Sequence, residues 1–200
     1  MSSMDSKPSF LTERFEVALV YTNRLHAEQK RKRSQVPYIA HLLGVTSYVL
    51  EDGGREDEAI AALLHDAVED QGGLDTLEEI RQRYGTGVAE IVIAVTDAHT
   101  DPKPPWRARK EKYIASIRTA SPQALRVSLA DKVYNARATL RDIRREGESG
   151  WERFNGGKEG TLWYYRQLIK EFAKHGSRDL LQELIRIVDQ LEQVSSNQGR

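Results

Sequence analysis

Apolar positions along the chain recur every three to four residues, which is the spacing of one face of an α-helix. The clearest example lies near the C-terminus, where Leu180, Leu184, Ile187 and Leu191 fall on a single helical stripe. No segment shows a convincing run of the two-residue alternation that is typical of a half-buried β-strand. The pattern therefore predicts an all-α protein.

Capping residues, glycines and prolines separate these periodic segments from one another. They predict helices over residues 10–33, 38–50, 56–71, 75–84, 88–95, 106–119 and 122–145, followed by two more helices after residue 160. Residues 101–105 contain three prolines and residues 147–160 are rich in glycine, so both segments are predicted to be loops. A single domain is expected over residues 10–194, with residues 1–9 and 195–200 disordered or frayed.

The composition narrows the possible functions. Thirty Lys and Arg residues balance thirty Asp and Glu residues, so the chain lacks the overall positive charge with which proteins bind nucleic-acid polymers and anionic membranes. The absence of cysteine excludes disulfides, thiolate catalysis and iron–sulfur clusters. The start of the chain lacks a signal-peptide pattern, and no apolar run approaches the roughly 18 to 20 residues of a membrane helix. We expect a cytoplasmic protein.

The helix predicted at residues 56–71 combines an apolar background with an unusual cluster of polar side chains. Apolar residues lie on nearly every face, yet the same segment carries His65, Asp66, Glu69 and Asp70. Between residues 56 and 79 there are nine acidic residues and no Lys or Arg, so the segment holds no local ion-pair partner. Two interpretations stay open at this point: the acids face solvent, or they surround a bound cation.

A metal site needs ligands from elsewhere in the chain, because neighbouring His and Asp side chains cannot enclose an ion. His41 lies among apolar residues in the second predicted helix, and Asp131 lies among apolar residues in the seventh, one turn before Asn135. Taken singly, each is more often a polar core residue that bonds to a neighbour. In the absence of cysteine, any metal would have to be held by histidine and carboxylate.

Together these residues resemble a known family. The order His41, His65-Asp66, Asp131 resembles the H…HD…D signature of the HD-domain metal-dependent phosphohydrolases. The match is closer to RelA/SpoT-type alarmone hydrolases, because residues 61–70 read AALLHDAVED, where that group has AALLHDxVED. The segments LHAEQKRK, PYIAH and LADKVYN are also similar to that group, and the resemblance spans about residues 15–139. It implies an HD-domain helical bundle with a metal site between helices.

The resemblance also implies a chemistry. His41, His65, Asp66 and Asp131 would hold one divalent ion, Mn²⁺ in the family. Glu69 and Asp70 match the acidic pair that positions a water molecule and takes its proton. The implied reaction removes the 3′-pyrophosphate from guanosine 3′,5′-bispyrophosphates, (p)ppGpp, or from the adenosine analogue, and yields GDP or GTP and pyrophosphate in the guanosine case.

A basic segment near the N-terminus could bind this polyanionic substrate. Residues 24–33 carry five basic residues and one acid, although a solvated helix face is an equally ordinary interpretation. By resemblance, Arg24 would pack against the base. The remaining candidates for nucleotide binding are Lys30, Arg31, Lys32, Lys132 and Asn135.

Two other functions stay open. The chain could be an HD nucleotidase that acts on other nucleotides, or a non-catalytic nucleotide-sensing or antitoxin-like protein, and an oligomer is possible. It departs from the alarmone hydrolases at Leu42, where they usually have proline, and at Gln71, where threonine is common. Residues 144–159 are too divergent to indicate which purine is preferred.

Overall fold

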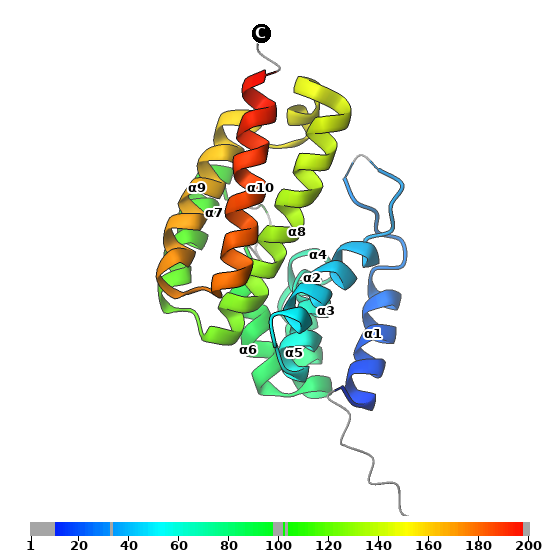
Figure 1. Cartoon of the computed structure of the whole chain (residues 1–200). Coiled ribbons are helices and arrows are strands. Elements are labelled where there is room, and N and C mark those ends of the chain that lie inside the picture. The colour runs from blue at the N-terminus through cyan, green and yellow to red at the C-terminus, as the bar shows by residue number, and fades with distance from the viewer. Residues whose placement is uncertain (1–10, 33, 98–101, 103, 198–200) are drawn as a thin grey trace, which may run out of the picture.

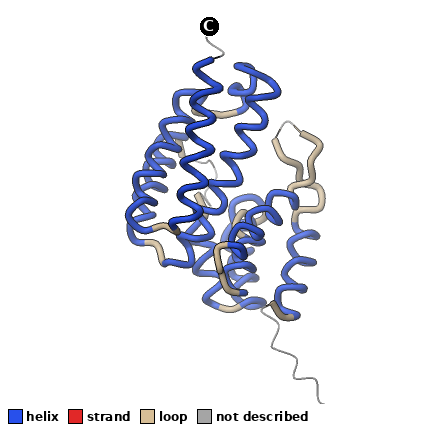
Figure 2. The backbone as a smooth tube through the Cα atoms, in the orientation of Figure 1, coloured by secondary structure: helices blue, strands red, loops and turns tan. Residues whose placement is uncertain are grey.

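The structure is a computed structural model that describes residues 11–32, 34–97, 102 and 104–197. Its described residues form helices and loops, and the only strand-like pairing among them is an isolated bridge between Lys30 and Pro37. Figure 2 shows helices throughout the described chain. The predicted all-α class is confirmed.

Ten α-helices and two short 3₁₀ helices, η1 (Ile117–Thr119) and η2 (Gly147–Arg153), make up the described fold. The α-helices are α1 (Glu13–Leu25), α2 (Ile39–Glu51), α3 (Glu56–Leu64), α4 (Ala67–Asp70), α5 (Gly73–Tyr84), α6 (Thr86–Val95), α7 (Trp106–Ser116), α8 (Pro122–Glu146), α9 (Gly157–His175) and α10 (Arg178–Asn197). In Figure 1, α8, α9 and α10 run side by side along one part of the molecule, while α1, α2, α3 and α5 gather in the other. No helix in the described part is both long and apolar enough to cross a membrane.

Helix α3 lies at the centre of the group formed by α1, α2, α3 and α5. Every residue from Glu58 to Leu64 is buried, as its apolar character on nearly every face predicts. It packs against α1, α2, α6 and α8, so its C-terminal end is enclosed on several sides. A polar side chain at that end is therefore held in a protein interior rather than in solvent.

Helix α8 is the longest described element, and it connects the group around α3 to α9 and α10. Its N-terminus is fixed by Ser121, whose hydroxyl accepts a hydrogen bond from the Ala124 N–H, and by Pro122 at the first helical position. It ends at Gly147, which adopts a left-handed φ of 66°. Between these ends α8 packs against α2, α3 and α6 as well as α9 and α10. Its middle therefore faces the end of α3.

The first helix is shorter than predicted. Helix α1 ends at Leu25, whereas the sequence predicted helix as far as residue 33. The following segment turns back on itself, because the N–H of Arg31 bonds to the carbonyl of Val36 and the N–H of Tyr38 bonds to the carbonyl of Gln29. Its basic residues therefore lie on a folded loop rather than along one helical face.

The predicted helix over residues 56–71 is interrupted at its centre. In a continuous α-helix the carbonyl of Ala62 would accept from the main-chain N–H of residue 66. Here that carbonyl accepts from Nδ1 of His65 at 2.8 Å, and helix α4 starts only at Ala67. Across this interruption His65 and Asp66 keep backbone angles of the right-handed helical region. Their side chains meet, with Nε2 of His65 3.2 Å from Oδ2 of Asp66.

Other boundaries also differ from the prediction. Part of the glycine-rich segment 147–160 forms η2 and the first turn of α9 rather than an open loop. Helix α10 continues beyond Ser195, which is buried and donates its hydroxyl to the Leu191 carbonyl, so the predicted fraying from residue 195 begins too early. Residues 1–9 and 198–200, and residues 101 and 103 of the predicted loop at 101–105, lie outside the described residues.

Candidate metal and nucleotide site

The side chains predicted to bind metal meet at one point, although they come from three separate parts of the chain. His41 is supplied by the first turn of α2, His65 and Asp66 by the break between α3 and α4, and Asp131 by the middle of α8. Nε2 of His41 lies 3.3 Å from Oδ2 of Asp66 and 3.4 Å from Oδ1 of Asp131. Nε2 of His65 lies 3.2 Å and 3.6 Å from the same two oxygens. Both histidines and Asp131 are buried, and Asp66 is half-buried.

The hydrogen bonds of His65 fix which of its nitrogens can bind a cation. A carbonyl can only accept, so the Nδ1 that bonds to Ala62 carries a hydrogen. The neutral ring therefore presents the lone pair of Nε2, which is buried without a hydrogen-bond partner, toward two carboxylates. An electron pair facing two anions in a protein interior requires a positive charge between them. The donor set of imidazole nitrogen and carboxylate oxygen fits a divalent metal ion.

In the protein without a bound metal, the two carboxylates favour a proton on His65, which supplies this positive charge. Burial alone would lower the pKa of His65, but the carboxylates of Asp66 and Asp131 outweigh burial and hold this pKa well above its usual value. Burial has the larger effect at His41 and lowers its pKa. The pKa values of both carboxyl groups lie below their usual range because neighbouring cationic groups outweigh burial, His65 being foremost for Asp66 and Lys132 for Asp131. Two charged carboxylates therefore face the imidazoles.

Neighbouring residues hold the two carboxylates in place. The hydroxyl of Tyr38 donates to Oδ2 of Asp66 at 2.6 Å. Asn135 donates to Oδ1 of Asp131 at 2.5 Å, and Nζ of Lys132 lies 2.6 Å from Oδ2 of the same side chain. Such outer contacts orient metal ligands and reduce the conformational freedom that binding would otherwise remove.

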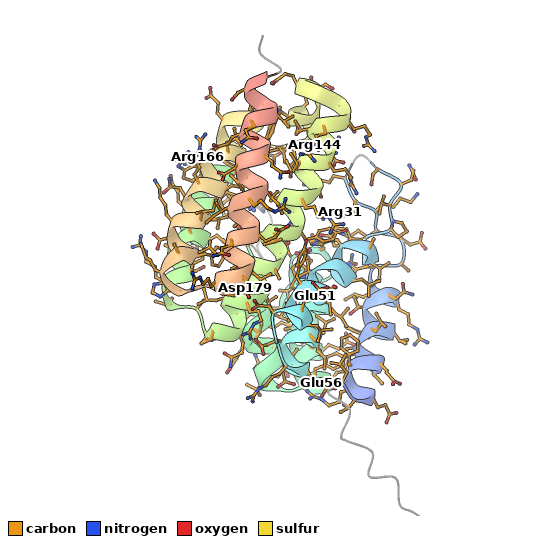
Figure 3. The ribbon with its side chains drawn as sticks, viewed as in Figure 1. Arg31, Glu51, Glu56, Arg144, Arg166 and Asp179 are labelled. Atoms are coloured by element: carbon orange, nitrogen blue, oxygen red, sulfur yellow. The ribbon has the colours of Figure 1, made fainter. Side chains whose placement is uncertain are left out.

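A cavity of about 160 Å³ opens directly beside this cluster. Three basic side chains, those of Arg31, Lys110 and Lys132, line it together with Glu69. Arg31 crosses from the loop after α1 to α8, where its guanidinium donates to Oδ1 of Asn135 at 2.9 Å (Figure 3). The cavity therefore combines a cation-binding cluster with three groups that attract anions.

The other predicted substrate and catalytic residues are distributed unevenly around this cavity. Lys132 and Asn135 line it, whereas Lys30 and Lys32 are exposed on the loop and lie outside its lining. Of the predicted acidic pair, Glu69 lines the cavity, and exposed Asp70 lies outside the lining and accepts a hydrogen bond from Gln29.

The structure does not bring Arg24 to the cavity. Its exposed side chain lies in a groove along α1, whose lining also contains Val17 and Arg83. The reason is the early end of α1 at Leu25, which leaves Arg24 on the helix and carries the later basic residues away on the loop. Arg31 is the arginine that lines the cavity.

Several lining residues were missed from the sequence. Tyr38 lies three residues before His41, one helical turn away, and that spacing could have indicated a contact with the site. Lys110 had no such signal, because it belongs to a run of basic residues that is typical of a solvated helix. It forms an ion pair at 2.9 Å with Asp97, which also lines the cavity and pairs with Arg109. Tyr113 and Ser128 complete the inner wall, with their hydroxyls 2.5 Å apart.

The acidic residues between positions 56 and 79 are not all part of this site. Glu56 and Asp57 form ion pairs with Arg14 of α1, and buried Glu58 forms one with Arg126 of α8. The lack of a basic residue nearby in sequence therefore did not mean that these acids lacked a partner. Only the residues from the helix break onward contribute to the cavity.

Comparison with known proteins agrees with this arrangement. Residues 18–162 match the model of the HD domain family, so the chain belongs to the HD domain family and the resemblance stated from the sequence is confirmed. Its relatives include proteins named guanosine-3′,5′-bis(diphosphate) 3′-pyrophosphohydrolase MESH1. The one from Xenopus tropicalis is 43% identical over 162 residues, which are 78% of this chain and 82% of the relative. The one from Homo sapiens is 39% identical over 134 residues, 66% of this chain and 70% of the relative.

Solved structures and longer bacterial relatives extend this comparison. A structure described as a metazoan ortholog of SpoT that hydrolyzes ppGpp superimposes with a TM-score of 0.75 and 26% identity, covering 92% of this chain and 97% of that chain. A guanosine-3′,5′-bis(diphosphate) 3′-pyrophosphohydrolase from Aquifex aeolicus is 34% identical over 134 residues, which are 67% of this chain but 19% of that relative. The chain thus corresponds to one part of the long bacterial protein and to most of the short animal proteins.

Proposed function

We propose that this protein hydrolyses the 3′-pyrophosphate of guanosine 3′,5′-bispyrophosphates and releases pyrophosphate with GDP or GTP. The observation that supports this most directly is the single cavity that joins a His41–His65–Asp66–Asp131 cluster to three basic side chains. The metal-binding part is common to HD-domain proteins, and the adjacent positive charge fits a substrate with several phosphates. The named relatives carry out this reaction on the same nucleotide class.

The proposed metal is Mn²⁺, held by the two imidazoles and the two carboxylates. When bound there, it would polarise a phosphoryl oxygen and lower the pKa of a bound water molecule. These donors also suit other divalent ions, so the assignment of Mn²⁺ rests on the family resemblance.

Basic residues of the cavity would hold the phosphates. The guanidinium of Arg31 is fixed by its bond to Asn135 and by the rings of Tyr38 and Tyr134, whose centroids lie 5.7 Å and 6.0 Å away. Lys132 lies 4.4 Å from the centroid of the Tyr113 ring. Because both cations are already ordered, phosphate binding would cost little further side-chain entropy.

Glu69, a carboxylate of the cavity outside the metal cluster, would act on water. Hydrolysis forms a bond between the water oxygen and the phosphorus next to the ribose, breaks the bond from that phosphorus to the 3′ oxygen, and leaves a proton on the 3′ oxygen. Glu69 lines the cavity from α4, on the same segment as the ligand Asp66, and would take the proton of the attacking water. Asp70, the next residue and the last of α4, would help to position the attacking water.

The test is hydrolysis by the purified protein with Mn²⁺. The panel contains guanosine and adenosine 3′,5′-bispyrophosphates and the 5′-monophosphates, with products separated by anion-exchange chromatography. We expect release of pyrophosphate from a 3′-pyrophosphorylated purine, abolished by chelator. Turnover of 5′-monophosphates alone would instead indicate a general nucleotidase, and binding without turnover would indicate a nucleotide sensor.

Paired variants test whether the loss of bound metal and activity is specific to the proposed site. Asp66→Asn should lose bound metal and activity, whereas Asp57→Asn, a carboxylate of α3 that pairs with Arg14, is the matched control and should keep both. Arg31→Ala should raise KM by about tenfold, which corresponds to roughly 1.4 kcal/mol, and should do so more strongly than Arg24→Ala. An equal rise in KM for Arg24→Ala would favour the role predicted from the sequence.

We also propose that the protein acts in the cytoplasm. The chain contains no cysteine, so it forms none of the disulfides that are common in secreted proteins. Fractionation of cells with detection of the protein would test this, and recovery in a membrane or secreted fraction would contradict it.

A further inference from the structure

We propose that Gln29 is a positioning residue for the reaction, which fixes Asp70, the neighbour of cavity-lining Glu69, and is itself oriented by His26 and Gln71. The proposal rests on the proposed function only for the catalytic importance of Asp70. Its basis is a chain of hydrogen bonds between the loop after α1 and the segment around α4. Gln29 belongs to that loop, and Asp70 is the last residue of α4.

The first link is the contact between Gln29 and Asp70. Nε2 of Gln29 donates to Oδ2 of Asp70 at 2.8 Å. A hydrogen bond to an ionised carboxylate is stronger than one between neutral groups. Asp70 is exposed, so without this donor its side chain would be free to sample several rotamers in solvent.

The second link determines which way the Gln29 amide points. Its Oε1 lies 2.6 Å from Nδ1 of His26 and accepts from Nε2 of Gln71 at 2.7 Å. If the amide were reversed, its NH₂ group would face the amide donor of Gln71, and its oxygen would face the carboxylate of Asp70. The present orientation is therefore strongly preferred, and it directs the NH₂ group to Asp70.

The third link is the anchoring of His26. The ring is buried, with 2% of the residue exposed, and it stacks on Tyr38 with centroids 5.4 Å apart and planes inclined by 20°. Tyr38 in turn donates to the metal-ligand candidate Asp66. The loop is therefore joined to the segment 66–71 by two routes: Tyr38 to Asp66, and Gln29 to both Asp70 and Gln71.

Gln71 contributes a second hydrogen bond to Gln29 that a shorter side chain could not make. The alarmone hydrolases that the sequence resembles commonly have threonine at this position. A threonine side chain is two heavy atoms shorter than glutamine, so it could not span the contact that Gln71 makes with Gln29. The additional donor belongs to this protein and strengthens the orientation of Gln29.

Arg31 lies on the same loop, two residues after Gln29. The loop that Gln29 fastens to α4 therefore also carries the guanidinium that lines the cavity. Loss of the Gln29 contacts should increase the motion of this loop as well as of Asp70. This gives the proposal a readout that does not depend on any substrate.

The experiment compares Gln29→Leu, Gln71→Thr and the matched control Gln82→Leu. Gln82 donates to Glu78 at 3.1 Å on the exposed face of α5, so it makes the same kind of bond away from the cavity. Hydrogen exchange should be faster in residues 26–38 of Gln29→Leu, less so in Gln71→Thr, and unchanged in the control. Unchanged exchange in Gln29→Leu would overturn the proposal, whether or not the protein hydrolyses a bispyrophosphate.

A kinetic cycle tests the action through Asp70. Gln29→Leu should lower kcat by about tenfold, because a misplaced Asp70 slows the chemical step. KM should rise less than in Arg31→Ala, because the guanidinium of Arg31 is still present. In the background of Asp70→Asn, Gln29→Leu should have no further effect on kcat. Equal losses in both backgrounds would show that Gln29 does not act through Asp70 and would overturn its assignment as a positioning residue.

The two experiments also separate this inference from the proposed function. If exchange is faster in Gln29→Leu but the wild-type protein does not hydrolyse bispyrophosphates, the proposed function is refuted. The contact between the loop and α4 would still be supported. Hydrolysis by the wild type, together with unchanged exchange, would retain the proposed function and refute the inference.

Discussion

Replacement of Gly44 by alanine tests whether close packing around the site outweighs helix propensity. Gly44 lies inside α2, one turn after His41, and alanine at an exposed interior position of a helix is normally more stable by about 1 kcal/mol. A Cβ added here would lie 2.5 Å from Cδ2 of Tyr134 and closer still to Cε2. Those separations are far inside van der Waals contact, so either Tyr134 or α2 must move.

The two opposing effects can be compared in magnitude. Overpacking of a well-packed interior costs typically about 1–3 kcal/mol, against a gain of about 1 kcal/mol from helix propensity. The ring of Tyr134 is not free to swing away, because its hydroxyl donates to the Ala40 carbonyl at 3.1 Å and its centroid lies 5.0 Å from that of His41. We therefore expect Gly44→Ala to lower the free energy of unfolding by about 1–2 kcal/mol. At about 2–4 °C per kcal/mol, the melting temperature should fall by about 2–8 °C.

The assay is urea and thermal unfolding followed by circular dichroism. Gly87→Ala in α6 is the matched control, because a Cβ there would meet only Oδ2 of Asp57 at 3.6 Å, an ordinary contact. In a background of Tyr134→Ala, which removes the ring, Gly44→Ala should become stabilising by up to about 1 kcal/mol. A stabilising effect of Gly44→Ala with Tyr134 intact would refute the reasoning.

Three further predictions concern charge, pH and metal. Arg126→Met should lower the free energy of unfolding by about 3 kcal/mol in urea titrations, because it leaves the buried carboxylates of Glu58 and Asp52 without their cation. Burial raises the pKa of Tyr165 from 10.0 to about 12, so the stability that comes from its neutral form is complete below pH 10 and is lost as the pH rises through about 12. The difference in urea midpoint between wild type and Tyr165→Phe should therefore change over that interval. Mn²⁺ at about a hundred times its Kd should stabilise the folded protein by about 2.7 kcal/mol and raise the melting temperature by about 5–10 °C, a gain that Asp66→Asn should lose.

Each of these three predictions has a result that would contradict it. An Arg126→Met protein as stable as the wild type would show that the two carboxylates find other partners. A midpoint difference for Tyr165→Phe that stays constant from pH 9 to pH 12 would show that this hydroxyl does not titrate with unfolding. Equal stabilisation of wild type and Asp66→Asn by Mn²⁺ would place the ion elsewhere.

Much of the fold was accessible from sequence because its signals are local. The stripe through Leu184 and Leu191 predicted the buried face of α10, and both residues are fully buried. Ser121 and Pro122 predicted the start of α8 at the residue where the structure has it. Periodicity and capping depend on contacts three or four residues apart, which a linear sequence displays directly.

The wrong predictions share a physical cause. The basic segment after Leu25 has no strong helix breaker before Pro37, yet it leaves the helix, because buried His26 and the pairing of the loop with itself compete with helix propensity. The break at His65 and Asp66 likewise depends on a side-chain bond to the Ala62 carbonyl. Side-chain and loop hydrogen bonds of this kind override helix propensities that amount to less than about 1 kcal/mol per residue.

The candidate site likewise combines features that the sequence predicts with features that depend on how the helices pack. The sequence by itself determined the helical class, the burial of α3 and, through the HDxVED-type segment, the HD domain family. Only the tertiary structure decided that Arg31 rather than Arg24 lines the cavity, and that Lys110 and Tyr38 belong to it. The reason is that helix periodicity reports which face of one element is apolar, whereas a site is built from side chains of several elements. Which side chains meet depends on how the helices pack against one another.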